Sequence, residues 1–261
     1  MSLARRNHLL AGASLALGIL VLWLHPADQY LFGDSISTLL TRTLSWRAAF
    51  LDLFRLGGTH WYRPLTNGWV QAIVWPLFGL NFAPYHYLAM AMHWAVCLGI
   101  FLFLRGVVQD TFAAWAGAAF YAWHPIQFYA TYDVCFFQEP IGIGFTFGAI
   151  AGFFWFVKRG HQGWLALGCA CFAMALVSRE VAVLTPALLA ILLWRPENWR
   201  RAATTVGATA AVAAAFVYAY LFVLHPQLHQ PAEYASDWSP ANMGGNLWKA
   251  ALWAFAIPLA L

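Results

Sequence analysis

The sequence predicts an all-α fold, a polytopic transmembrane helical bundle with about seven or eight spans. Composition and recurring apolar segments both point to it. Hydrophobic residues make up 62% of the 261 residues, charged residues make up 9%, and the mean hydropathy is +0.63. Soluble domains carry roughly 45–50% apolar and about 25% charged residues. A soluble fold could not bury this much apolar surface, whereas lipid solvates it.

Apolar segments that approach the length of a spanning helix recur along the chain. Such a helix needs about 20 mostly apolar residues. We predict spans at about residues 8–24, 85–104, 111–127, 140–157, 163–178, 181–194 and 203–224, with an eighth that begins near residue 247. The eighth segment stops at residue 261 with nothing polar after it. We therefore expect residues 1–261 to be a single module, and an N-terminal fragment of a longer protein.

Residues 25–84 are predicted to form a long non-cytoplasmic loop, and the uncertain part is the apolar stretch 62–80. The excess of Lys and Arg in cytoplasmic loops decides how to treat it. Without a span there, eight of the 14 cations face the cytoplasm: Arg5, Arg6, Arg105, Lys158, Arg159, Arg195, Arg200 and Arg201. With a span there, only Arg5, Arg6, Arg179 and Lys249 do. We therefore expect 62–80 to be a re-entrant or interfacial helix.

The earlier part of this loop is predicted to be an amphipathic helix that lies in the membrane interface. Its apolar residues recur at helical spacing: Ile36, Leu39, Leu40, Leu44, Ala48 and Leu51. The same topology puts all acidic residues except Asp110 and Glu197 on the non-cytoplasmic side. Acidic residues contribute little to orientation and did not enter the choice. Their gathering at one face therefore indicates a site there.

Asp34, just after the first span, is a candidate general base. Partial desolvation at the bilayer edge makes a carboxylate more basic, which suits the deprotonation of an acceptor hydroxyl. The alternative is a helix N-cap, formed by Asp34 or Ser35 in front of the amphipathic helix. The residues alone leave both interpretations open.

Arg63, next to Tyr62 and in front of a proline, is a candidate phosphate ligand. A guanidinium at a membrane surface binds phosphate through two parallel hydrogen bonds. The alternative is a snorkelling arginine, whose guanidinium extends to the membrane interface without binding a ligand.

Asp133 and Glu139 lie in or next to the second outer loop, residues 124–139. An acid at the edge of a span that faces the bundle interior is often functional. Glu139 precedes Pro140, however, and a glutamate in the first turn of a helix is also favoured by the helix dipole. The residues alone leave both interpretations of Glu139 open.

Arg179 and Glu180 lie between two predicted spans with almost no loop. Charges at that depth need partners. We expect a structural ion pair, with phosphate binding by Arg179 as the alternative.

The histidines and cysteines do not predict a metal site. His86 and His93 share one helix face, but no acid or cysteine joins them at ligand spacing. We therefore expect hydrogen-bonded helix residues. The cysteines show neither a disulfide framework nor a metal pattern: they are Cys97, Cys135, Cys169 and Cys171. No feature indicates a nucleic-acid partner.

A series of short motifs resembles a known family in its order and spacing. The motifs are Tyr62-Arg63-Pro64-Leu65-Thr66, Leu77-Phe78-Gly79-Leu80-Asn81, Tyr85-His86, His93, Phe120 to His124-Pro125, Glu139, and Ser178-Arg179-Glu180 before Pro186. Together, over residues 25–195, they resemble the O-mannosyltransferase-like proteins of the GT-C superfamily that often carry tetratricopeptide repeats. The sequence departs from that family at Ser35, where a second acid is common, and at Arg179, where lysine is usual. It also lacks the repeats.

The resemblance implies a glycosyltransferase that takes a sugar from a polyprenyl-phosphate or dolichyl-phosphate carrier. The acceptor would be a hydroxyl of a protein or glycan at the periplasmic or lumenal face, and transfer would usually invert the anomeric carbon. It further implies that Asp34 is the acid of the first loop, that Arg63 contacts the carrier phosphate and that Glu139 lines the same pocket. The expected site therefore has Asp34 and Glu139 as catalytic residues and these substrate-binding residues: Tyr62, Arg63, His86, Asp133, Arg179 and Glu180.

Two other functions stay open, a transporter or flippase for lipid-linked sugars and a non-catalytic membrane scaffold. A transporter buries its charges near mid-span or breaks helices there, whereas these charges gather at one face. No cofactor is required, although the acids would accept a divalent cation. The expected location is a bacterial inner membrane, with the endoplasmic reticulum as the alternative.

Overall fold

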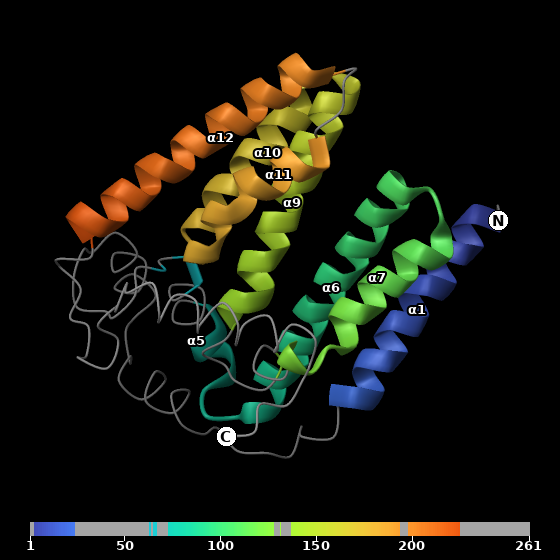
Figure 1. Ribbon diagram of the computed structural model, residues 1–261. Helices are drawn as coiled ribbons and strands as arrows, with labels where there is room; N and C mark the ends of the chain where they lie inside the picture. Colours follow the sequence, from blue (N-terminus) through green and yellow to red (C-terminus); the bar gives the residue numbers. More distant parts are fainter. Residues whose placement is uncertain are drawn as a thin grey trace, which may run out of the picture.

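The computed structural model describes residues 3–23, 63, 65–66, 73–127, 131, 137–193 and 198–224. Within these ranges every regular element is helical (Figure 1). The elements are α1 (Leu3–Trp23), α5 (Trp75–Phe78), α6 (Phe82–Val108), α7 (Thr111–Trp123), η3 (Pro125–Gln127), α9 (Gln138–Arg159), α10 (Gln162–Leu176), η5 (Glu180–Leu184), α11 (Thr185–Leu193), α12 (Trp199–Ala219) and η7 (Tyr220–Leu224). The predicted all-α class is confirmed for this part of the chain.

Helices occupy each of the seven segments predicted as spans before residue 225. Among the described residues, three helices are long and apolar enough to cross a membrane: Phe82–Val108, Gln138–Arg159 and Trp199–Val223. Other apolar helices are shorter, at 10–17 residues: Asn7–Leu22, Gln162–Leu176 and Glu180–Leu193. The structure thus supports a membrane protein with three candidate spans, and the total of seven or eight stays a prediction. The expected helices over 36–51 and from 247 lie outside the described residues.

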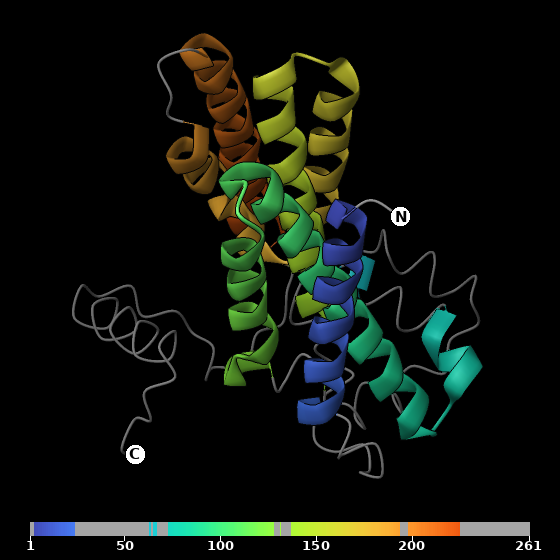
Figure 2. The ribbon, with the colours of Figure 1, turned by 90° about the vertical axis from the view of Figure 1, so that its right-hand side faces the viewer.

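The helices alternate in direction, which gives the bundle two ends (Figures 1 and 2). We call the end where α6 and α9 begin, and where α1 and α10 finish, the α9 N-terminal end. The opposite one is the α9 C-terminal end. The last turn of α1 and the first turn of α6 thus lie at the same end. That 62–80 is a re-entrant or interfacial helix stays a prediction, because residues 62, 64 and 67–72 lie outside the described residues. In the described part of that stretch, α5 is a helix of four residues.

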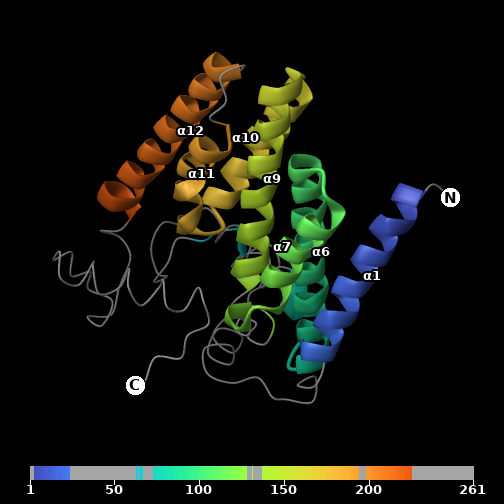
Figure 3. The ribbon, with the colours of Figure 1, turned by 45° about the vertical axis from the view of Figure 1, so that its right-hand side comes forward.

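Three hydrophobic clusters form the core of the described residues, and the smallest, at the start of α6, consists of Val74, Tyr85, Ala89 and Phe137. The other two are larger. One joins α1, α6 and α7, and the other joins α9, α10, α11 and α12 with the last turns of α6. In Figure 3, α9 lies on the side of its group that faces α6 and α7, and α12 packs along α11. Both groups therefore meet along α9, and the site described below forms where α9 begins.

Glycines bring α9 and α10 into direct backbone contact. A Cβ atom built on Gly152 would lie 2.6 Å from the backbone nitrogen of Gly168, and one on Gly148 would lie 2.9 Å from the sulfur of Cys171. Gly148 and Gly152 are four residues apart, the small-residue spacing that allows membrane helices to approach closely, while Gly144 lies against Val96 of α6. This seam fixes the position of the α10 C-terminus relative to α9.

Tight turns connect the helices at the α9 C-terminal end. Gln109 adopts a left-handed conformation with φ 62° and ends α6, and Asp110 accepts a hydrogen bond of 2.6 Å from the Ala113 amide to cap α7. Gly160, with φ 75°, ends α9 in the same way. These short connections make α6–α7 and α9–α10 two helical hairpins.

Candidate functional site

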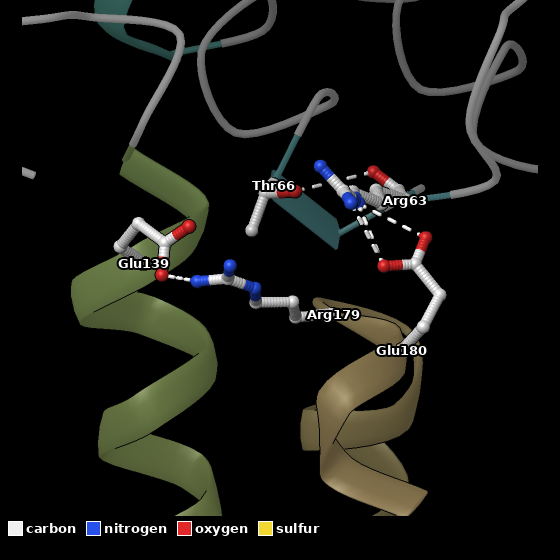
Figure 4. Close-up of polar contacts among 5 residues, drawn as sticks. All are labelled: Arg63, Thr66, Glu139, Arg179 and Glu180. Atoms are coloured by element: carbon white, nitrogen blue, oxygen red, sulfur yellow. Dashed lines mark hydrogen bonds and ion pairs between the residues drawn. The ribbon is translucent and has the colours of Figure 1, made fainter. Parts of the chain in front are cut away.

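Four charged side chains meet at the α9 N-terminal end (Figure 4). They are Arg63, from the segment that precedes α5; Glu139, in the first turn of α9; Arg179, the residue before η5; and Glu180, the first residue of η5. Segments more than 100 residues apart in sequence thus contribute to one cluster, as the separation of 117 residues between Arg63 and Glu180 shows. We call these four residues the charge cluster.

Arg63 and Glu180 form a bidentate ion pair. The Nη2 atom of Arg63 donates to Oε2 of Glu180 at 2.8 Å, and its Nε atom donates to Oε1 at 3.0 Å. The side chains are 15% and 27% exposed, so solvent screens the pair only in part. The Thr66 hydroxyl, 3.4 Å from the Arg63 carbonyl oxygen, donates to it within the same turn. This arrangement anchors the Arg63 segment to the start of η5.

Arg179 and Glu139 form the second ion pair, which joins the α10–η5 connection to α9. Gly142, one turn after Glu139 on the same face of α9, makes room for it. A Cβ atom on Gly142 would lie 3.1 Å from Cβ of Arg179 and 3.8 Å from its Cδ. The aliphatic part of Arg179 therefore crosses α9 over a glycine before its guanidinium reaches Glu139.

The backbone between α10 and η5 explains why neighbouring residues choose different partners. The Ser178 hydroxyl donates to the Met174 carbonyl at 2.6 Å and so satisfies one terminal carbonyl of α10. Arg179 is then extended, with φ −159° and ψ 134°. Successive side chains of an extended backbone point to opposite sides. Arg179 therefore turns towards α9, while Glu180 turns towards Arg63 (Figure 4).

The cluster is electrically neutral but partly withdrawn from water. Burial, followed by the nearby charge of Arg63, lowers the pKa of the Arg179 guanidinium below its ordinary value, while Glu180 opposes the shift. Arginine stays protonated at neutral pH, so the Arg179 guanidinium keeps its charge despite this shift. Glu139 is also in the first helical turn, next to Pro140. Glu139 can therefore interact with the dipole of α9 and with Arg179 at the same time.

Of the predicted site residues, the structure brings together Arg63, Glu139, Arg179 and Glu180. Asp34, Tyr62 and Asp133 lie outside the described residues. Arg179 and Glu180 each form an ion pair, but not with each other: Arg179 pairs with Glu139, and Glu180 pairs with Arg63.

His86 has a position within the bundle rather than at its surface. It is 1% exposed, its Nδ1 atom lies 2.7 Å from the carbonyl oxygen of Thr131, and its ring stacks on Phe82. It therefore fastens α6 to the chain after α7. His93 likewise makes a hydrogen bond of 3.0 Å to the Ala122 carbonyl oxygen. The expectation of hydrogen-bonded helix histidines is confirmed for both. Within the described residues, no group of three or more His, Cys, Asp and Glu residues is arranged to hold a metal ion.

Two features of the site were not predicted from the sequence. The aliphatic part of Arg179 packs against Gly142. The position of this glycine three residues after Glu139 was the sequence signal that could have indicated the contact. Tyr220, the first residue of the π-helical η7 that continues α12, lies within electrostatic reach of Arg63 and Glu180, and α12 packs against η5. No local pattern points from Tyr220 to this site, because only the packing of α12 brings it near.

The charge cluster can do two things chemically. Two guanidinium groups provide forked donors for a phosphate, and two carboxylates provide acceptors for hydroxyl groups. No family model, no curated protein and no solved structure matches this chain. The resemblance to the GT-C superfamily therefore rests on the quoted motifs, and the function is argued from the cluster.

Proposed function

We propose that the protein is a membrane glycosyltransferase that moves a sugar from a polyprenyl-phosphate carrier to an acceptor hydroxyl at the α9 N-terminal end. One observation carries the proposal: Arg63 and Arg179 converge with two carboxylates at one end of a bundle that has candidate membrane spans. A lipid-linked donor would present its phosphate at such an end, next to the acyl region that holds its chain.

The two arginines would bind the donor phosphate, which is the leaving group. A guanidinium held in place by a carboxylate is already oriented, so little rearrangement precedes the reaction. Donor phosphate would compete with Glu180 for Arg63 and with Glu139 for Arg179. A carboxylate released in this way can accept a hydrogen bond from a sugar hydroxyl. This gives Glu139 its positioning role in the proposed site.

The transfer itself is a single displacement. Asp34, in the segment after α1, would take the proton of the acceptor hydroxyl. The acceptor oxygen would form a bond to the anomeric carbon as the bond from that carbon to the phosphate oxygen breaks, and polyprenyl phosphate would leave with the electron pair. The configuration would invert. A divalent cation is compatible with these acids, but no step depends on one.

The proposal is tested by incubating the purified full chain with a radiolabelled polyprenyl-phosphate hexose in mixed micelles. We expect loss of hexose transfer and hydrolysis in Asp34→Asn, and a reduction of about 100-fold or more in Arg63→Ala. Arg63→Lys keeps the charge but loses the fork, and should recover little activity. Arg200→Ala is the matched control, because Arg200 is exposed at the opposite end. Equal turnover in wild type and Arg63→Ala would contradict the proposal.

A transporter or flippase of lipid-linked sugars is the second candidate. Both guanidinium groups are ion-paired at one end of the helices, whereas a transport site is expected near mid-span. Reconstituted vesicles distinguish the two functions. A transferase consumes labelled donor in the presence of acceptor, while a flippase moves intact donor between leaflets without consuming it. A scaffold does neither.

A further inference from the structure

The α9 C-terminal end carries an unassigned group of cations around one glycine. Arg201, in the first turns of α12, places Nη1 2.9 Å from the position of a Cβ atom on Gly160. Lys158 and Arg159 form the last turn of α9 immediately before this glycine. Side chains from two helices therefore gather where α9 ends. All three are exposed, and none of them takes part in an ion pair with another described residue.

Arg159 and Lys158 make cation–π contacts with the same tryptophan. The guanidinium carbon of Arg159 lies 4.4 Å from the ring centre of Trp155, and Nζ of Lys158 lies 5.2 Å from the same centre. Trp155 also contacts Trp164 of α10, at 6.5 Å between ring centres. Tryptophan is enriched at the level of lipid head groups, and α9 and α12 both belong to candidate membrane spans. A bilayer around these candidate spans would therefore present its phosphates near the three cations.

The charges around the group leave a positive balance. Asp110 is the acidic residue of the described part at this end, and its Oδ1 atom caps α7. Glu197 belongs to this end by sequence and lies outside the described residues. The C-terminal dipole of α9 contributes only about half a negative charge. Asn198 at the start of α12 makes no side-chain capping bond, so the amides of that first turn add positive potential.

We propose that Arg159 and Arg201, with Lys158, bind the phosphodiester head group of an anionic phospholipid between the end of α9 and the start of α12. The acyl chains would lie along the apolar faces of these two helices. Gly160 has φ 75°, which favours glycine, and the absence of a side chain there leaves room for the Arg201 guanidinium. The site lies at the opposite end from the charge cluster and does not depend on the proposed transferase activity.

The test compares phosphatidylglycerol with phosphatidylcholine of the same acyl chains, titrated into detergent micelles of the purified full chain. Thermal unfolding is followed at each lipid fraction. We expect saturable stabilisation by phosphatidylglycerol, beyond that given by phosphatidylcholine. Arg201→Gln and Arg159→Gln should each raise the half-saturating fraction of phosphatidylglycerol about fivefold. Arg200→Gln is the matched control: it removes the same charge from the neighbouring position, where the side chain lies over Trp199.

Three outcomes would overturn the proposal. The first is equal stabilisation by the two lipids. The second is an equal effect of Arg200→Gln and Arg201→Gln, which would indicate diffuse surface charge. The third is equal stabilisation by soluble glycerol phosphate, which would indicate a free anion as the ligand. Each variant is first unfolded in phosphatidylcholine alone. If Arg201→Gln does not fold there, Arg159→Gln and Arg201→Lys carry the test, with weakened binding expected in the first and retained binding in the second.

Discussion

At the scale of single residues, the charge cluster shows how a pair of adjacent charges can serve two different contacts. Arg179 and Glu180 neighbour each other, yet the extended backbone at Arg179 sends them apart. Each ion pair then joins segments that are distant in sequence. Partly buried pairs of this kind lose more when one partner is removed than when both are, because the remaining charge is left without compensation.

The pair of Arg179 and Glu139 is expected to show that asymmetry. Arg179→Ala should lower the free energy of unfolding by about 1–3 kcal/mol, and the double variant Arg179→Ala/Glu139→Ala by less than the sum of the two single changes. The expected coupling is about 1 kcal/mol. Denaturant unfolding in mixed micelles measures all three variants. Additive effects of the two substitutions would show that the pair contributes nothing to stability.

Gly142 is expected to be sensitive to side-chain size because Arg179 lies against it. Gly142→Ala puts a Cβ atom 3.1 Å from Cβ of Arg179, which small shifts can absorb, whereas Gly142→Leu would displace the arginine. We expect the leucine variant to lower the unfolding midpoint and to remove the coupling between Arg179 and Glu139. Gly99→Ala is the control, since a Cβ atom there meets nothing within 4 Å. A leucine variant with unchanged midpoint and coupling would contradict the described position of Arg179.

At the scale of elements, the closeness of α9 and α10 determines where the charge cluster forms. The two helices touch through the backbones of Gly152 and Gly168. A wider spacing would move the α10–η5 connection away from the start of α9. Helix association in lipid depends on such packing, because lipid chains are as apolar as the helix surfaces.

Gly152→Val is therefore expected to destabilise the hairpin by about 3 kcal/mol. Its side chain would meet backbone atoms at 2.6–3.0 Å, and backbone cannot move aside as a flexible side chain can. Gly207→Ala, in α12, is the control because a Cβ atom there meets nothing within 4 Å. Thermal unfolding in phosphatidylcholine micelles gives the comparison. Similar midpoints for the two variants would mean that α9 and α10 do not make this contact in the membrane.

At the scale of the whole molecule, the direction of the helices places the charge cluster and the cation group at opposite ends. A cysteine-free chain tests this directly, with Asn81→Cys or Gln162→Cys as the single thiol. Both positions are exposed and make no side-chain hydrogen bond that a cysteine would remove. We expect a membrane-impermeant maleimide to label the two positions from opposite sides of the membrane. Labelling from the same side would mean that the chain crosses the membrane an even number of times between residues 81 and 162, and not once in each of α6, α7 and α9.

The orientation of the chain follows from the same experiment. The charge count places residue 162 on the cytoplasmic side and residue 81 on the other. Labelling of Asn81→Cys in intact cells would agree with that orientation. Labelling of Gln162→Cys instead would invert it and would put the charge cluster on the cytoplasmic face, where a lumenal or periplasmic transfer reaction could not occur.

The sequence alone determined the helical class, the positions of seven helices and the grouping of charges at their ends. It could do so because apolar length and charge are local properties that a bilayer reads directly. It did not determine the partners of Arg63 and Arg179, the role of Gly142 or the approach of Tyr220 and Arg201. Those depend on how closely α9, α10 and α12 pack, and contacts between segments that are distant in sequence, by 117 residues for Arg63 and Glu180, leave no local pattern. Only the tertiary structure decides them, because the distance between helices depends on the side chains of both.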